Sequence, residues 1–143
     1  MRRIARSAII DSSAETFYAL VSDIESYPEF LPWCKAVDAH EKGRATLLLD
    51  LKGVRYSLTT ENHYEAGKSI SMSLVEGPFR HFQAEWRFMP LGANAVKAEF
   101  ALEYEFSNPV VAKLLETVFE RMADSTVDAF VRRAADQRDE AAR

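Results

Sequence analysis

The chain has 143 residues, of which 48% are hydrophobic and 28% are charged, and its net charge is −4. A chain of this length buries roughly 70% of its unfolded surface as one domain, so we expect a single domain over residues 1–143. The one cysteine, Cys34, excludes an internal disulfide, and the acidic balance disfavours DNA, which needs a basic protein face.

The amino-terminal segment does not fit a targeting sequence. Arg2 and Arg3 resemble the start of a signal peptide, but the apolar stretch Ile4–Ile10 is short and is interrupted by Arg6. A helix needs about 20 apolar residues to span a bilayer, and no apolar run in the sequence approaches this length. We therefore expect a cytoplasmic protein, with the periphery of the inner membrane as an alternative location.

A strand and two short helical segments are predicted first. Residues 3–10 fit a strand, and Ser12 and Glu15 have the spacing of a capping box, which predicts a helix beginning near Ser12. Apolar residues then recur at helical spacing, at Phe17, Leu20, Val21 and Ile24. The stretch Tyr27–Pro32 contains two prolines and predicts one helical turn or a loop.

From Trp33 onward, apolar and polar residues alternate with a period of two, which is typical of strands. The six expected strands cover residues 33–41, 45–51, 54–64, 70–74, 82–88 and 96–106. Lys52–Gly53 and Ala66–Gly67 mark turns between them. Consecutive strands with short connections favour an antiparallel meander.

The last part of the chain predicts one long helix. Asn108 is a suitable N-cap, and Pro109 fits the first helical position. A helix from Pro109 to Ala135 would be about 40 Å long. The charged tail Asp136–Arg143 is expected to fray.

These elements together predict an α+β fold. A sheet of about seven strands is roughly 30 Å wide, whereas one helix covers about 10–12 Å, so the sheet must curve around the helix. The aromatic residues of the covered face are Tyr56, Phe82, Trp86, Phe88, Phe100, Tyr104 and Phe106. Periodicity alone leaves two alternatives: these rings fill the space, or they enclose an apolar pocket with the Tyr56 and Tyr104 hydroxyls in its wall.

The sequence contains no recognisable catalytic or metal-binding pattern. His40, His63 and His81 lie on three different expected strands, without metal-ligand spacing to Cys34. Cys34 has no adjacent histidine, which favours a buried structural thiol over a nucleophile. The acidic residues of the last strand, Glu99, Glu103 and Glu105, alternate onto its solvent face. We therefore expect no enzyme, no catalytic residue and no bound metal.

Two loops could control access to the covered face. The segment Tyr27–Cys34 is rich in aromatic residues and proline, and it could plug the edge of the sheet or form a lid. The segment Gly77–Arg80 predicts a turn. An exposed Phe79 at its tip would suit a membrane surface or a protein partner, and the alternative is an ordinary turn with Phe79 folded under.

Three segments resemble the coenzyme Q-binding protein family of the START-like, polyketide cyclase/dehydrase superfamily. They are YPEFLPWC at Tyr27–Cys34, GPFRHFQAEWRF at Gly77–Phe88, and the run Tyr104–Ala134. The resemblance covers nearly the whole chain and implies one START-like domain with a helix-grip fold in the order β-α-α-β6-α. Mitochondrial members bind ubiquinone and support respiration. The bacterial RatA members are described as toxins that bind the large ribosomal subunit and block subunit association.

Our leading hypothesis is non-catalytic binding of ubiquinone or a similar polyprenyl quinone, with no other cofactor. The alternatives are a ribosome-directed toxin and an enzyme of the cyclase/aromatase kind, which would need polar catalytic groups in the cavity. A ribosome binder would need folding to cluster the scattered arginines Arg2, Arg3, Arg6, Arg80, Arg87, Arg132 and Arg133. Expected ligand contacts are Tyr27, Phe30, Trp33, Tyr56, Phe79, Phe82, Trp86, Phe88, Phe100, Tyr104, Val118, Phe119 and Met122.

Overall fold

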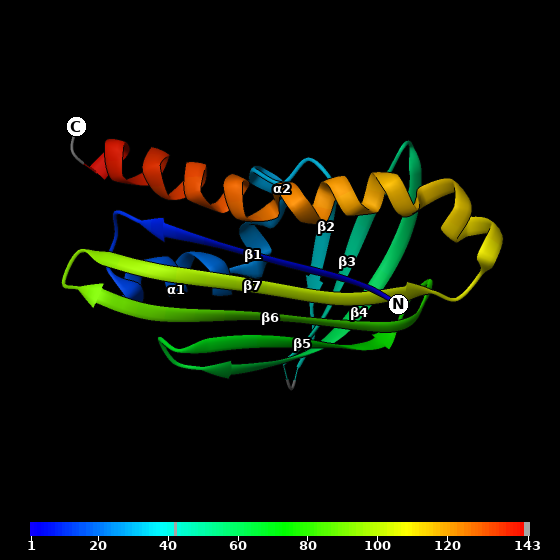
Figure 1. Cartoon of the computed structure of the whole chain (residues 1–143), viewed down its shortest axis with the longest axis horizontal. Helices are drawn as coiled ribbons and strands as arrows, with labels where there is room; N and C mark the ends of the chain where they lie inside the picture. The colour runs from blue at the N-terminus through cyan, green and yellow to red at the C-terminus, as the bar shows by residue number, and fades with distance from the viewer. Residues whose placement is uncertain (42, 142–143) are drawn as a thin grey trace.

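A computed structural model describes residues 1–41 and 43–141 as one antiparallel sheet covered by one long helix (Figure 1). The strands are β1 (Arg2–Ile10), β2 (Cys34–Ala39), β3 (Arg44–Leu51), β4 (Val54–Glu65), β5 (Ser69–Glu76), β6 (Phe79–Gly92) and β7 (Ala95–Phe106). The helices are α1 (Ala14–Ser22), the 3₁₀ helix η1 (Ile24–Glu29) and α2 (Pro109–Ala141). This order confirms the α+β prediction.

The strands β2 to β7 form the expected meander, because each pairs antiparallel with the next along the chain. The first strand adds to the far edge of this meander, where β1 pairs with β7 from Arg2 opposite Tyr104 to Ile10 opposite Val96. The spatial order is therefore β1-β7-β6-β5-β4-β3-β2. The two edges of the sheet are β1 and β2.

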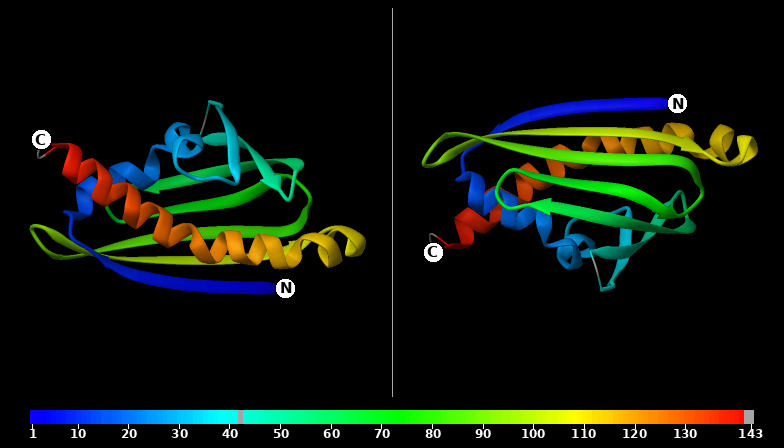
Figure 2. Two further views of the ribbon diagram at one scale, coloured as in Figure 1. Left: turned by 90° about the horizontal axis from the view of Figure 1, so that it is seen from above. Right: turned by 90° about the horizontal axis from the view of Figure 1, so that it is seen from below.

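The sheet curves around α2, as its width requires. Within the described strands the register shifts at Cys34/Ala36, Thr59/Thr60, Phe79/His81 and Pro90/Gly92. An extra residue in one strand bends it and increases its twist, so such irregularities help the sheet to curl. Figure 2 shows α2 lying diagonally across the sheet, with β1 along one side and the β2–β3 hairpin with η1 along the other.

Alternation along β7 places one face of this strand under the helix. The buried side chains are Val96, Ala98, Phe100, Leu102, Tyr104 and Phe106. The glutamates between them lie on the opposite face and form ion pairs: Glu99 with Lys97, Glu103 with Arg3, and Glu105 with Arg80. The expectation of a charged outer face on this strand is confirmed.

The cap of α1 differs from the prediction by one residue. The N-cap is Ser13, whose Oγ accepts a hydrogen bond from the Thr16 backbone N–H at 3.1 Å. Ser12 instead directs its hydroxyl to the Ser13 carbonyl at 3.3 Å. The capping-box spacing of Ser12 and Glu15 therefore misplaced the helix start, because the neighbouring serine supplies the acceptor.

We expect Ser13→Ala to lower the free energy of unfolding by about 1 kcal/mol, since the first turn of α1 loses its side-chain acceptor. Chemical denaturation followed by circular dichroism measures the change. Ser12→Ala is the matched control and should change stability by less than about 0.5 kcal/mol. Equal losses in the two variants would contradict this assignment of the cap.

The long helix α2 begins as predicted and ends later. Asn108 Oδ1 accepts hydrogen bonds from the Val110 N–H at 2.8 Å and from the Val111 N–H at 3.4 Å. The helix continues to Ala141, beyond the predicted end at Ala135, and the fraying of its charged last turns stays a prediction. Arg138 anchors this end by donating from Nη1 to the Asp11 carbonyl at 2.7 Å. Residues 142–143 of the expected tail lie outside the described residues.

The turn before β6 does not present an apolar tip. Phe79 is only 4% exposed, and its ring stacks on Phe106 with the centroids 4.8 Å apart. It also lies 5.3 Å from the Phe119 ring on α2. The exposed alternative for Phe79 is therefore wrong, and the folded-under alternative is correct. In the described part of the chain, no helix has the length and hydropathy to cross a membrane.

Candidate functional site

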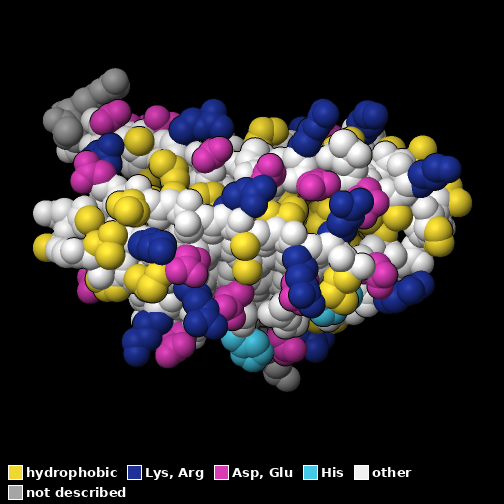
Figure 3. Space-filling view, in the orientation of Figure 1, with side chains coloured by type: hydrophobic (Ala, Val, Ile, Leu, Met, Phe, Trp, Pro, Cys, Tyr) yellow, Lys and Arg dark blue, Asp and Glu magenta, His cyan; other side chains and the backbone are white. Residues whose placement is uncertain are grey.

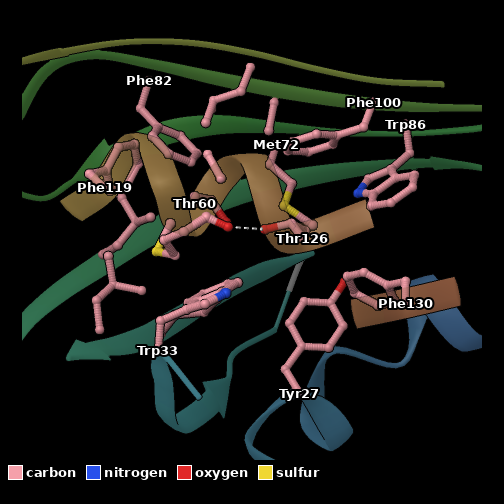
Figure 4. A pocket seen from close by; sticks show the side chains of 17 residues that line it. Tyr27, Trp33, Thr60, Met72, Phe82, Trp86, Phe100, Phe119, Thr126 and Phe130 are labelled. Atoms are coloured by element: carbon pink, nitrogen blue, oxygen red, sulfur yellow. Dashed lines mark hydrogen bonds between the residues drawn. The ribbon is translucent and has the colours of Figure 1, made fainter. Parts of the chain in front are cut away.

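A cavity of about 70 Å³ lies between the concave face of the sheet and α2 (Figure 4). Its walls come from η1, the loop before β2, five strands of the sheet and the middle of α2. The lining residues are Tyr27, Trp33, Leu47, Leu49, Leu58, Thr60, Met72, Phe82, Ala84, Trp86, Phe100, Leu102, Phe119, Met122, Ala123, Thr126 and Phe130. The aromatic rings therefore leave a small space open.

The three hydroxyls of this lining already have partners within the protein. Thr60 Oγ1 donates to Asn62 Oδ1 at 2.8 Å, and Thr126 Oγ1 donates to the Met122 carbonyl at 2.9 Å. The Tyr27 hydroxyl donates to the Val21 carbonyl, and burial raises the pKa of Tyr27 well above its ordinary value. The wall consequently presents mainly apolar surface to the cavity.

We take the half-buried side chains of the lining as the part of the cavity wall that is nearest the surface. Among the lining residues that the structure describes, four are only half-buried, and these are Trp33, Met72, Phe82 and Met122. They come from the loop before β2, from β5, from β6 and from α2. We call these four residues the mouth. Thioether side chains are flexible, so Met72 and Met122 can change conformation at low cost.

Ion pairs connect α2 to the β1 edge of the sheet. Arg2 Nε donates to Glu116 Oε1 at 2.7 Å, with Glu120 at 4.0 Å, and Arg6 pairs with Asp124. The three acidic residues follow at intervals of four, so they share one face of α2. Exposed pairs contribute about 0–1 kcal/mol each, but together they hold the β1 edge against α2.

The structure brings seven of the thirteen expected ligand contacts together in the lining. These are Tyr27, Trp33, Phe82, Trp86, Phe100, Phe119 and Met122. Six others lie outside it, namely Phe30, Tyr56, Phe79, Phe88, Tyr104 and Val118. Five of these six are aromatic, and Val118 belongs to the apolar residues that recur at helical spacing after Asn108. Phe88 instead packs against Phe17 and Tyr18, and Phe79 against Phe106.

The Tyr104 hydroxyl lies outside the cavity wall. Tyr104 is fully buried, and its hydroxyl has no hydrogen-bond partner among the described residues. Burial, with the negative charges of Glu120 and Glu116, raises the pKa of Tyr104 to about 12. This side chain contributes to the packing around Phe119, where the two ring centroids are 4.5 Å apart.

Most of the lining that the sequence analysis missed is aliphatic or small. The missed residues are Leu47, Leu49, Leu58, Thr60, Met72, Ala84, Leu102, Ala123, Thr126 and Phe130. Strand alternation already marked Leu47, Leu49 and Leu58 as inward-facing. Phe130 likewise belongs to the apolar stripe that recurs at helical spacing from Val111 to Ala134. The hydrophobic pattern therefore predicts these aliphatic and aromatic lining positions equally well.

Six of the seven arginines considered for a basic face form ion pairs with carboxylates. Ion pairs join Arg2 to Glu116, Arg3 to Glu103, Arg6 to Asp124, Arg80 to Glu105, Arg87 to Glu85 and Arg133 to Glu29. On the face seen in Figure 3, basic and acidic side chains are interspersed. An extended basic face, which phosphate recognition would favour, is not present on that side.

Cys34 is a buried thiol, as expected. It is 2% exposed, and burial raises the pKa of the thiol from 9.0 to about 11.

Because the thiolate is the reactive form, we expect Cys34 to react with Ellman's reagent at pH 8 at least ~10-fold more slowly than in guanidinium-unfolded protein. The neutral thiol stabilises the fold fully below pH 9, and this contribution is lost as the pH rises towards 11. Equal rates in folded and unfolded protein would contradict the burial.

Relatives of known name share most of this chain. The sequence is 38% identical to the ribosome association toxin RatA of Vibrio cholerae over 138 residues, which cover 94% of this chain and 96% of that protein. A mitochondrial coenzyme Q-binding protein of Drosophila melanogaster is 22% identical over 139 residues, covering 91% of this chain and 57% of that protein.

Solved structures share the fold. A START superfamily protein from Mycobacterium smegmatis matches with a TM-score of 0.81 and 21% identity, covering 94% of this chain and 98% of that one. The Zhui aromatase/cyclase matches with a TM-score of 0.80 and 18% identity, covering 94% of this chain and 93% of that one. The helix-grip fold of the START superfamily is therefore confirmed. Residues 10–131 match the model of the family described as polyketide cyclase / dehydrase and lipid transport, and the chain belongs to that family.

Proposed function

We propose that this protein binds an apolar molecule in the cavity under α2, and that a polyprenyl quinone such as ubiquinone is its ligand. The observation that carries the proposal is the mainly apolar lining of the cavity. Its polar side-chain atoms are the hydroxyls of Tyr27, Thr60 and Thr126 and the indole nitrogens of Trp33 and Trp86. Burying an isoprenoid chain against such a wall stabilises a complex by about 25 cal/mol per Å².

The size of the cavity requires that binding be coupled to opening. A volume of about 70 Å³ is well below the roughly 300–1,000 Å³ of most small-molecule sites. A quinone therefore enters only when the mouth widens. The four mouth residues are the part of the lining that is not fully packed, and two of them are methionines with low-cost rotamer changes.

The proposed binding is non-catalytic. General acid–base catalysis needs a titratable group within hydrogen-bond reach of the ligand. Among the lining residues that the structure describes, the carboxylate, imidazole, ammonium and thiol groups are absent and Tyr27 alone titrates. Its hydroxyl already donates to Val21, and its pKa is raised by burial. This favours a binding protein over the cyclase/aromatase alternative.

The test is lipid extraction. Protein purified from its native host should release a quinone that mass spectrometry identifies, and the apo protein should bind added short-chain ubiquinone by calorimetry. The absence of any quinone in the extract, together with no binding of the added quinone, would refute the proposal. If the extract instead contains a lipid of another class, the cavity is still a binding site, but its ligand is that lipid and not a quinone.

A ribosome-directed activity is the second candidate. The 38% identity to RatA over nearly the full length of both chains favours it, and this exceeds the 22% identity to the coenzyme Q-binding relative. In this role the protein would bind the large ribosomal subunit in the cytoplasm and block subunit association. The quinone role would add contact with the periphery of the inner membrane.

Sucrose-gradient profiles test the second candidate. Overexpression should increase free subunits at the expense of assembled ribosomes, and the protein should co-sediment with the large subunit. Unchanged profiles without co-sedimentation would contradict it. The quinone test and the ribosome test use separate measurements, so either function can fail without affecting the result for the other.

A further inference from the structure

A groove of about 370 Å³ lies on the surface next to the mouth, between the loop after η1 and the later turns of α2. Its walls include Phe30, Pro32, Trp33, Ala129, Arg132 and Arg133. Trp33 also lines the central cavity, so one indole side chain borders both spaces. Figure 4 shows Trp33 at the edge of the cavity, on the side of the loop before β2.

The backbone around Trp33 is fixed, while its side chain is only half-buried. The Trp33 carbonyl accepts a hydrogen bond from the Asp50 N–H at 2.8 Å, and the Cys34 N–H donates to the Leu31 carbonyl at 3.0 Å. A rotation of the indole would leave these backbone hydrogen bonds intact. The cavity and the groove taken together reach the size range of a small-molecule site.

The groove offers hydrogen-bond donors in a charge-balanced setting. Arg133 Nη2 donates to Glu29 Oε1 at 2.9 Å, and its guanidinium lies 5.1 Å from the centre of the Phe30 ring. Arg133 Nε is buried and has no acceptor in the described part of the chain. Arg132 and Arg133 are balanced by Glu29 and Asp136 in the same walls.

This balance indicates which chemistry the groove recognises. A free anion would gain little, because the two carboxylates offset the two guanidinium groups. An uncharged group with oxygen acceptors suits an unused N–H donor without adding charge. The rings of Phe30 and Trp33 supply flat apolar surface for a planar group.

We propose that the groove holds the uncharged, oxygen-bearing head group of the ligand whose apolar chain occupies the cavity. Trp33 turns to connect the two spaces and to uncover the buried Arg133 Nε, which then donates to a carbonyl oxygen of that head group. The proposal rests on the quinone function proposed above, and it assigns the head group to a site outside the cavity.

The experiment compares two probes and two variants by calorimetry. The probes are a short-chain ubiquinone and the isoprenoid hydrocarbon of the same chain length, which has no oxygen to accept a hydrogen bond. Arg133→Lys keeps a positive charge beside Glu29 but removes the Nε donor and the planar fork. Arg138→Lys is the matched control, because Arg138 lies further along α2 and outside this groove. Thermal melting checks that both variants remain folded.

We expect Arg133→Lys to weaken ubiquinone binding about 10-fold and hydrocarbon binding less than about 2-fold, with the control variant unchanged. Equal weakening of both probes, or no weakening, would overturn the proposal. If the unmodified protein binds both probes equally, the groove assignment fails and the cavity function stands. If it binds neither, the proposed quinone function fails as well. In a separate titration of the unmodified protein, tighter binding of a fatty-acid anion than of ubiquinone would contradict an uncharged head group in the groove.

Discussion

Replacing Phe119 by alanine is expected to lower the free energy of unfolding by about 3–5 kcal/mol, because a buried ring would leave a cavity. Phe119 is fully buried on α2. Its ring centroid lies 4.5 Å from that of Tyr104, 5.3 Å from that of Phe79 and 5.6 Å from that of Phe106. One side chain thus holds the helix against two strands, β6 and β7.

Chemical denaturation at neutral pH measures this loss. Leu114→Ala is the matched control, because Leu114 lies on the same helix and is 69% exposed. It should change the free energy of unfolding by less than about 0.5 kcal/mol. A loss below about 1 kcal/mol for Phe119→Ala would mean that the packing between helix and sheet is not the main source of stability.

Replacing Ala123 by leucine is expected to weaken quinone binding at least ~10-fold, because the larger side chain would occupy the space that the ligand needs. Ala123 is 1% exposed and lines the cavity from the middle of α2. The cavity holds only about 70 Å³, so the added branched side chain would fill much of it. Calorimetry with a short-chain ubiquinone measures the effect.

The control for this prediction is Ala135→Leu, the same exchange on the same helix at a half-buried position outside the cavity lining. It should leave ubiquinone affinity within about 2-fold of the unmodified protein. Overpacking costs about 1–3 kcal/mol, so thermal melting must show that both variants are folded. Unchanged binding in folded Ala123→Leu would place the ligand outside the cavity.

The sequence predicted the layers well, because they depend on local periodicity. Strict alternation in residues 96–106 identified every buried side chain of β7, and the apolar stripe after Asn108 identified the covering helix. The cap of α1 was missed by one residue, because Ser12 and Ser13 are chemically equivalent candidates and only the backbone geometry distinguishes them.

The cavity was harder to predict, because it depends on how the sheet curves. Register shifts such as the one at Thr59/Thr60 help to set that curvature, and they leave no clear signal in the hydrophobic pattern. Whether space remains also depends on side-chain volumes at facing positions, so small residues such as Ala84 and Ala123 matter as much as the rings. Whether Tyr27–Cys34 plugs the edge of the sheet or forms a lid depends on the same curvature and side-chain volumes. Tyr27 is buried in the wall, while Trp33 stands half-buried at the mouth.

The pairing of β1 with β7 has a consequence for how the chain folds. Residues 2–10 pair with residues 96–104, so among the described strands this is the pairing most distant in sequence. Such contacts carry a high loop-closure entropy and form late. During synthesis, β1 would leave the ribosome long before β7 exists. The meander can assemble meanwhile, and the first strand made becomes one of the last to dock.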